Sequence, residues 1–116
     1  MTFLVSAGPS YEGPVVYVIQ AGYCGPVKIG TTSSSRLPKR LAQLQTANAD
    51  RLHVLRTYVG GVGLERELHR RFAASRLAGE WFSFSDEIRA LVVDPPNFPE
   101  LVVIRGKVVS RKGVAA

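Results

Sequence analysis

Residues 15–31 read VVYVIQAGYCGPVKIGT, and this stretch decides the fold. β-Branched and aromatic residues dominate its two ends, residues 15–19 and 27–31, which is the composition typical of strands. A Gly- and Pro-containing segment of hairpin size, residues 21–26, separates the two runs. The stretch therefore predicts two antiparallel strands that open the domain.

Three periodic segments follow the hairpin. Leucines three and four residues apart predict a helix over residues 36–47, with Pro38 tolerated in its first turn. Residues 52–59 carry apolar side chains on both faces, which predicts a third, central strand. An apolar residue at every fourth position, from Leu64 to Phe72, predicts a second helix over residues 62–75.

The last third of the chain is less regular. Residues 79–84 resemble a short extended piece, and residues 85–92 begin with acidic side chains that favour a helix start. Residues 101–104 form an apolar run of strand length, and the basic, glycine-containing residues 105–116 predict a mobile tail.

The order of these elements, β-β-α-β-α-α followed by an appendage, defines the expected fold class. It is an α/β (α+β) domain with a small, three-stranded, mainly antiparallel sheet flanked by helices and a C-terminal strand-like appendage. The expected division is an irregular lead-in over residues 1–14, a domain over 15–93, and a Pro-rich linker, short strand and basic tail over 94–116.

The composition indicates the cellular compartment of the protein and the class of its binding partner. The 116 residues fit one domain, and the single cysteine, Cys24, excludes an intramolecular disulfide and favours a reducing, cytoplasmic setting. No apolar run reaches the roughly 18 residues of a membrane span. The net charge is +6, and residues 28–76 hold ten Lys and Arg against three acidic residues. This concentration indicates a polyanionic partner, with a solvated basic surface as the plainer interpretation.

Short motifs fall on the predicted elements in a recognisable order. Val15-Val16-Tyr17 and Lys28-Ile29-Gly30 lie on the hairpin, and the first helix carries RLAQLQT from residue 40. The second helix carries Glu65-x-x-Leu68-His69, and Gly79-Glu80-Trp81-Phe82 follows it. With these motifs, residues 15–93 resemble the GIY-YIG nuclease superfamily, in its compact phage or bacterial branch with a KIG second signature.

The resemblance implies a metal-dependent endonuclease that hydrolyses DNA phosphodiester bonds. In it, Glu65 would hold Mg²⁺ or Mn²⁺, Tyr17 would lie near the attacking water, and Arg40 would contact the phosphate. These residue types suit those roles, since hard cations prefer oxygen ligands and Arg binds phosphate through two parallel hydrogen bonds. Lys28 is expected to supply a positive field for Tyr17, and His69 to transfer a proton.

DNA, expected to be duplex, would be bound through phosphates. The sequence offers no helix-turn-helix or zinc finger, which predicts low sequence specificity. A homodimer or a recruiting protein is a further option for a second partner. The candidate nucleic-acid-binding residues are Lys28, Thr31, Arg36, Lys39 and Arg40.

The same residues allow other readings. Lys28, Thr31 and Leu44 depart from the superfamily pattern, which leaves open a catalytically impaired domain that acts as a nucleic-acid-binding or protein-interaction module. Without the resemblance, Tyr17 is an ordinary packing residue, and Glu65 and His69 form a side-chain pair on one helix face. A structural protein of a larger assembly is the least specific alternative.

Overall fold

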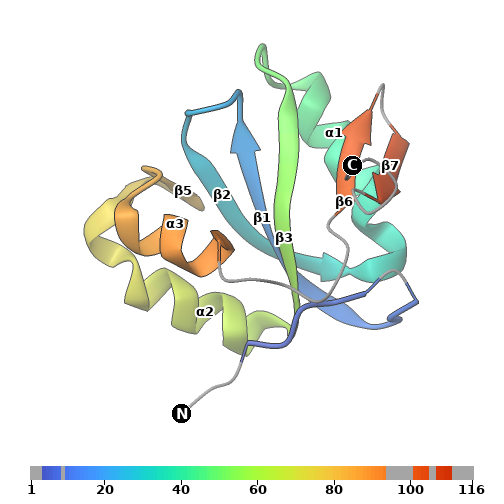
Figure 1. Ribbon diagram of the computed structural model, residues 1–116, viewed down its shortest axis with the longest axis horizontal. Helices are drawn as coiled ribbons and strands as arrows, with labels where there is room; N and C mark the ends of the chain where they lie inside the picture. The colour runs from blue at the N-terminus through green and yellow to red at the C-terminus, as the bar shows by residue number, and fades with distance from the viewer. Residues whose placement is uncertain (1–3, 9, 94–100, 105–106, 111–116) are drawn as a thin grey trace.

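The computed structural model describes residues 4–8, 10–93, 101–104 and 107–110 (Figure 1). Its centre is an antiparallel five-stranded sheet in the order β3-β1-β2-β5-β4. The strands are β1 (Pro14–Ala21), β2 (Val27–Ser33), β3 (Leu52–Val59), β4 (Arg76–Ala78) and β5 (Trp81–Phe82). The helices are α1 (Leu37–Thr46), α2 (Val62–Arg71) and α3 (Asp86–Val93), with 3₁₀ turns η1 (Ser34–Arg36) and η2 (Ala73–Ser75).

The opening hairpin is confirmed. Strands β1 and β2 pair antiparallel, with Tyr17 opposite Gly30 and Val18 opposite Ile29. Gly22 begins the connecting turn with a φ of 65°, a conformation that glycine adopts without steric cost. Strand β1 is buried along almost its whole length because β2 and β3 flank it on both sides.

The alternation of side chains along β1 divides the core into two layers. Val16 and Val18 face the layer that Leu68 of α2 and Ile88 of α3 complete. Tyr17 and Ile19 face the opposite layer, which contains Leu37 and Leu41 of α1. Helices α2 and α3 therefore cover one face of the sheet, and α1 covers the other (Figure 1).

The predicted three-stranded sheet and its element order are wrong. The sheet has five strands, because β4 and β5 lie between α2 and α3 and extend it along the edge of β2. Strand β4 has three exposed residues and β5 has two residues, so neither has the length or alternation that identifies a strand locally. The two strands form because β5 pairs with the edge of β2, and this tertiary contact cannot be identified from the local sequence.

The position of the third strand also differs from its prediction. Strand β3 lies at one end of the five-stranded sheet, next to β1, and is not central. Its outer edge is covered by the lead-in, where the amide of Ala7 donates to Thr57 O at 2.9 Å and the amide of Val59 donates to Val5 O at 2.7 Å. The apolar side chains of β3 pack into both core layers, with Tyr58 on the side of α2 and α3 and with Leu52 and Val54 on the side of α1.

The three helices are confirmed; α1 and α2 are shorter than predicted, and α3 is displaced by one residue. Helix α2 ends at Arg71, and residues 73–75 continue as the 3₁₀ turn η2. The predicted strand over 101–104 is β6 (Leu101–Ile104), and it pairs with β7 (Lys107–Ser110), which lies where only a tail was expected. The expected Pro-rich linker over 94–100 lies outside the described residues, and the domain boundaries stay a prediction. Within the part of the chain that the structure describes, no helix is long and apolar enough to span a bilayer.

Candidate functional site

Tyr17 lies directly over Gly30 in the hairpin. The two residues are register partners, and the Tyr17 side chain is only 1% exposed. A Cβ placed on Gly30 would lie 2.6 Å from Cζ of Tyr17 and 3.0 Å from Oε1 of Glu80. The phenol hydroxyl and the Glu80 carboxylate therefore converge on the space that the missing side chain of Gly30 leaves.

Arg40 approaches the same phenol from α1. Leu37 and Leu41 are buried and fix this helix on the sheet, and Arg40 lies one turn after Leu37, at the border of the buried face. Its guanidinium lies close enough to the Tyr17 hydroxyl for each group to shift the pKa of the other. Hydrogen bonding and charge interaction with Tyr17 raise the pKa of Arg40 above its usual value, so the guanidinium stays positive.

The environment of Tyr17 sets its protonation. Burial raises the pKa of the phenol, and the hydrogen bond and charge of Arg40 oppose this effect. The carboxylates of Glu80 and Glu65 raise it further, and the pKa lies above 10.0 in sum. The phenol is therefore protonated near neutral pH, and the cation beside it is Arg40.

Glu65 and His69 reach this region from α2, which packs on the opposite face. Of the described β2 residues, Val27 and Lys28 pair with β5 and the amide of Ile29 donates to Glu80 O, so the cover of β2 on that side ends at Ile29. At this open edge, Nε2 of His69 lies 2.7 Å from the carbonyl oxygen of Ile29. Glu65 lies one helical turn earlier, close enough for its charge to act on Tyr17.

His69, the predicted proton donor, has contacts at both ring nitrogens. Nε2 contacts Ile29 O, and a guanidinium nitrogen of Arg76 lies 3.4 Å from Nδ1. The ring also packs against Phe82, with centroids 5.1 Å apart. These contacts attach α2 to the sheet edge, and a role in proton transfer stays a prediction.

Lys28, the expected field donor for Tyr17, is paired with a carboxylate, and its role at Tyr17 stays a prediction. Its Nζ lies 3.1 Å from Oε1 of Glu80, and its side chain is 11% exposed. Sequence reasoning missed Glu80 as a site residue. The only sequence signal for it was the motif Gly79-Glu80-Trp81-Phe82, which carried no chemistry by itself.

The predicted nucleic-acid-binding residues separate into two groups. Arg36, Lys39 and Arg40 come together and line an open pocket of about 490 Å³. Thr32 and Gln43, which the sequence did not single out, complete its lining. Thr31 lies elsewhere, because it is opposite Val16 and its hydroxyl donates to Val15 O at 2.8 Å. We call the pocket lined by Thr32, Arg36, Lys39, Arg40 and Gln43 the basic groove.

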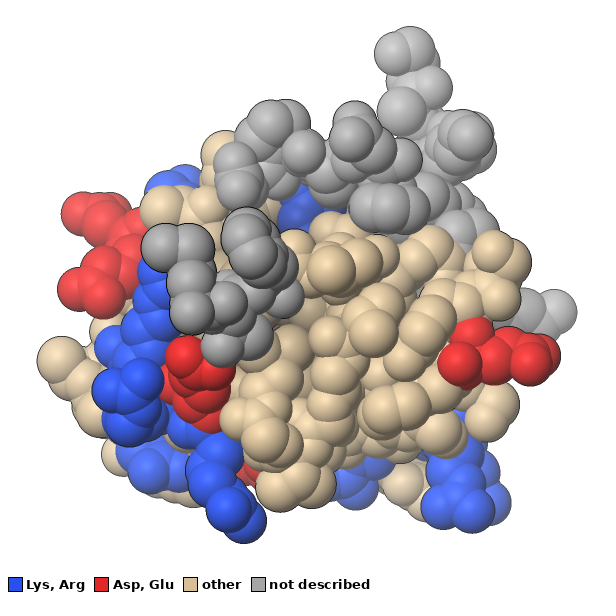
Figure 2. Space-filling view, turned by 90° about the horizontal axis from the view of Figure 1, so that it is seen from below, with Lys and Arg blue, Asp and Glu red and all other residues tan. Residues whose placement is uncertain are grey.

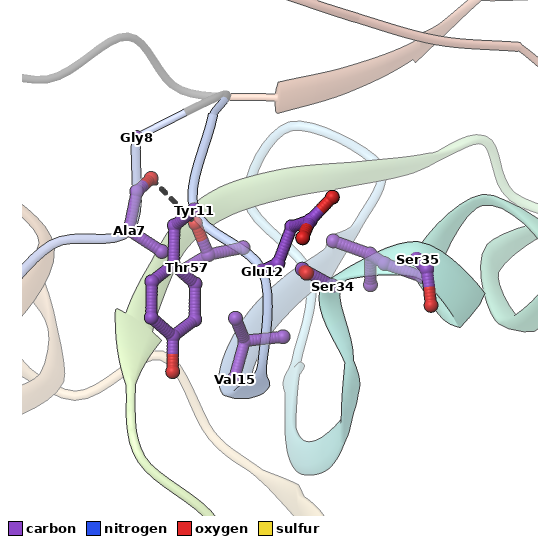
Figure 3. Close-up of a pocket in the computed structure, with 9 residues that line it drawn as sticks. Ala7, Gly8, Tyr11, Glu12, Val15, Ser34, Ser35 and Thr57 are labelled. Carbon is purple, nitrogen blue, oxygen red and sulfur yellow. Dashed lines mark hydrogen bonds between the residues drawn. The ribbon is translucent and has the colours of Figure 1, made fainter.

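A second pocket lies on the other side of η1. It has a volume of about 250 Å³, and Figure 3 shows Glu12, Ser34 and Thr57 among the residues around it. Its full lining is Ala7, Gly8, Tyr11, Glu12, Val15, Ser34, Ser35, Leu37 and Thr57. It contains none of the predicted site residues, and its one charged group is a carboxylate, so it does not extend the basic groove.

Charge is unevenly distributed over the surface. Figure 2 shows basic side chains gathered with acidic ones at the side of the molecule where α2 lies, beside a broad uncharged area. The exposed cations of α2 are Arg66, Arg70 and Arg71, and Arg70 lies 4.0 Å from Glu67. Of the two regions, the basic groove on α1 is therefore the one with cations and no carboxylate.

The site is sparse in metal ligands. Among the residues that the structure describes, no group of three or more His, Cys, Asp or Glu side chains could hold a metal ion. Mg²⁺ retains several waters and commonly binds through one or two carboxylates together with substrate phosphate. Glu65, which is half-buried and close enough for its charge to act on Tyr17, fits a cation of this kind.

The comparisons with known proteins gave one family. The model of the T5orf172 domain matches residues 14–94. No curated protein matches the chain, and no solved structure does.

A first prediction concerns Gly30. We expect Gly30→Ala to lower the free energy of unfolding by about 1–3 kcal/mol, because the added methyl collides with Tyr17 and Glu80. Gly63→Ala is the matched control, since a Cβ at that helical position meets open space. Urea denaturation measures both variants, and equal stability of the two would contradict the geometry.

A second prediction concerns the proton of Tyr17. The difference in ultraviolet absorbance between the wild type and Tyr17→Phe should titrate with a midpoint above pH 10.0, because burial outweighs Arg40. A pKa raised in the folded state stabilises the fold fully below pH 10.0, and this stabilisation is lost as the pH rises through the folded pKa. A midpoint at or below 10.0 would mean that the hydrogen bond with Arg40 dominates.

Proposed function

The chain belongs to the T5orf172 domain family, and from this premise we propose that it is a GIY-YIG-type, metal-dependent endonuclease. Its substrate is DNA, in duplex form, and it hydrolyses phosphodiester bonds with little sequence preference. The observation that carries the proposal is that Arg40 and Glu65, from two other elements, both lie close enough to Tyr17 for their charges to shift its pKa. These are the residues to which the resemblance assigns the water, the phosphate and the metal.

Arg40 is the phosphate-binding group in this proposal. One part of its guanidinium engages Tyr17, and the side chain also lines the basic groove. A guanidinium has five N–H donors in a rigid plane, so it can hold the phenol and a phosphate oxygen together. Its positive charge then stabilises the negative charge that develops on the phosphoryl oxygens.

Tyr17 positions the attacking water. Its phenol is protonated near neutral pH, so in the free protein it acts through hydrogen bonds and not as a resident phenolate. Because Gly30 and Arg40 fix the ring from two sides, the hydroxyl is held in one place before DNA arrives. This arrangement lowers the entropic cost of aligning water and phosphate.

Glu65 is the proposed ligand of Mg²⁺ or Mn²⁺. Bound there, a divalent cation would polarise the phosphoryl oxygen and stabilise the leaving oxygen. Glu65 lies in the first turn of α2, which fixes its backbone, and its side chain is half-buried. Its charge acts on Tyr17, which supports a place for both residues around one reacting phosphate.

The basic groove is the proposed track for the DNA backbone. Arg36 and Lys39 flank Arg40, and Thr32 and Gln43 add neutral hydrogen-bonding groups. Contacts of this kind bind phosphates, so affinity falls as salt rises and sequence has little effect. A second copy of the chain or a recruiting protein stays a prediction.

A second candidate function is a DNA-binding module without cleavage. It is favoured by Lys28, which stands in the position of a superfamily tyrosine and is paired with Glu80. In this alternative the basic groove still binds DNA, while the altered position has lost its catalytic group.

Cleavage of supercoiled plasmid tests the proposal. We expect the wild type to nick the plasmid with Mg²⁺ or Mn²⁺ and to stop when a chelator is added. Glu65→Gln should slow nicking about a hundredfold or more, because a bound cation contributes several kcal/mol to the transition state. Glu67→Gln on the same helix is the matched control and should nick like the wild type.

The two candidate functions give opposite results in this assay. A clear mobility shift of DNA with no nicking in any metal would support the binding module. Equal nicking by Glu65→Gln and the wild type would remove Glu65 from the metal site.

A further inference from the structure

Lys28 and Glu80 form an ion pair on the sheet face that carries Tyr17. We propose that Glu80 is a positioning residue of the site, which holds Lys28 away from DNA and fixes the space beside Tyr17. Lys28, which the sequence analysis predicted to bind nucleic acid, then acts as part of an ion pair and not as a phosphate-binding lysine. This inference rests on the proposed function, since it concerns the same site.

The ammonium of Lys28 is enclosed by its neighbours. Its Nζ lies 3.1 Å from Oε1 of Glu80 and 5.6 Å from the centroid of the Trp81 ring. The Lys28 side chain is 11% exposed, whereas that of Glu80 is 35% exposed. A cation this deeply buried is tolerated when an anion and an aromatic face compensate for lost water. Lys28 is therefore satisfied within the protein and does not face the basic groove.

Glu80 is held by the backbone on both sides of its position. Its carbonyl oxygen accepts a hydrogen bond of 3.0 Å from the amide of Ile29. The preceding Gly79 has a φ of 56°, and its carbonyl oxygen accepts from Nε of Arg76 at 2.7 Å. The carboxylate thus projects from a fixed turn between β4 and β5, which suits a residue that positions others.

The pair acts on Tyr17 through space. Oε1 of Glu80 lies 3.0 Å from the Cβ position of Gly30, which the Tyr17 ring also adjoins. Removing Lys28 leaves an uncompensated carboxylate next to the phenol and to the incoming phosphate. Removing Glu80 leaves a buried ammonium without its carboxylate partner. Either single change should therefore harm the site more than loss of both charges together.

The test uses the full chain with Lys28→Met, Glu80→Gln and the double variant. We expect each single variant to lower kcat for plasmid nicking by about tenfold to a hundredfold, with little change in KM, because misplacement affects the reacting groups. The double variant should be faster than the slower single variant. A compensating gain of this kind is not produced by two independent losses.

Binding of a short DNA duplex at several salt concentrations is the second readout. Lys28→Met should keep the wild-type dependence of affinity on salt, because Lys28 contacts no phosphate. Lys39→Met, in the basic groove, is the matched comparison and should reduce the slope of log affinity against log salt by about 1. Circular dichroism checks the fold of each variant. If Lys28→Met does not fold, Glu80→Gln and the double variant carry the comparison.

Two results would overturn the inference. One is a salt slope for Lys28→Met as low as that for Lys39→Met, which would make Lys28 a phosphate ligand. The other is a double variant no faster than the slower single variant. A wild type that cuts nothing would remove the endonuclease proposal instead, and the salt slopes would still decide the role of Lys28.

Discussion

The close approach of Tyr17 to the bare Cα of Gly30 is the constraint on which the site depends. The hairpin register places the two residues opposite each other, and a Cβ at Gly30 would collide with the phenol. Because this space is free of side chain, a large ring can lie buried while its hydroxyl remains within reach of α1. Arg40 meets the hydroxyl there, and Glu80 approaches the same space from the turn after β4. One glycine thus lets two elements besides the hairpin converge on one phenol.

The sheet edge explains how α2 contributes from the opposite layer. Strand β5 is only two residues long, so its strand pairing with β2 ends at Lys28; at the next residue, the amide of Ile29 donates to Glu80 O and His69 contacts Ile29 O. Glu65 comes to the edge with it. The formal charges around Tyr17 balance, because the two cations Arg40 and Lys28 are matched by the two carboxylates of Glu65 and Glu80. Burial keeps the phenol protonated, and in the proposed function Arg36 and Lys39 of the basic groove remain to attract DNA.

Strong local patterns made the hairpin and the three helices predictable from the sequence. Strands β4 and β5 were not predictable, because three and two residues carry no period and their pairing needs the edge of β2. Arg36, Lys39 and Arg40, the last of them predicted through the family resemblance, line one groove, whereas strand alternation turns Thr31 to the α2 side. Binding of nucleic acid by these residues stays a prediction. Glu80 was not predicted as a site residue, because only the fold brings it close to Gly30 and Lys28, and its position in the sequence does not indicate these contacts.

The central claim is that Tyr17 and Arg40 act as one unit in DNA cleavage. A double-mutant cycle on the nicking rate, with Tyr17→Phe, Arg40→Gln and the double variant, tests it most directly. We predict that each single change slows nicking about a hundredfold and that the double variant is about as slow as the slower single one, as for residues that work together. Losses that multiply in the double variant, or single variants that nick like the wild type, would contradict the account.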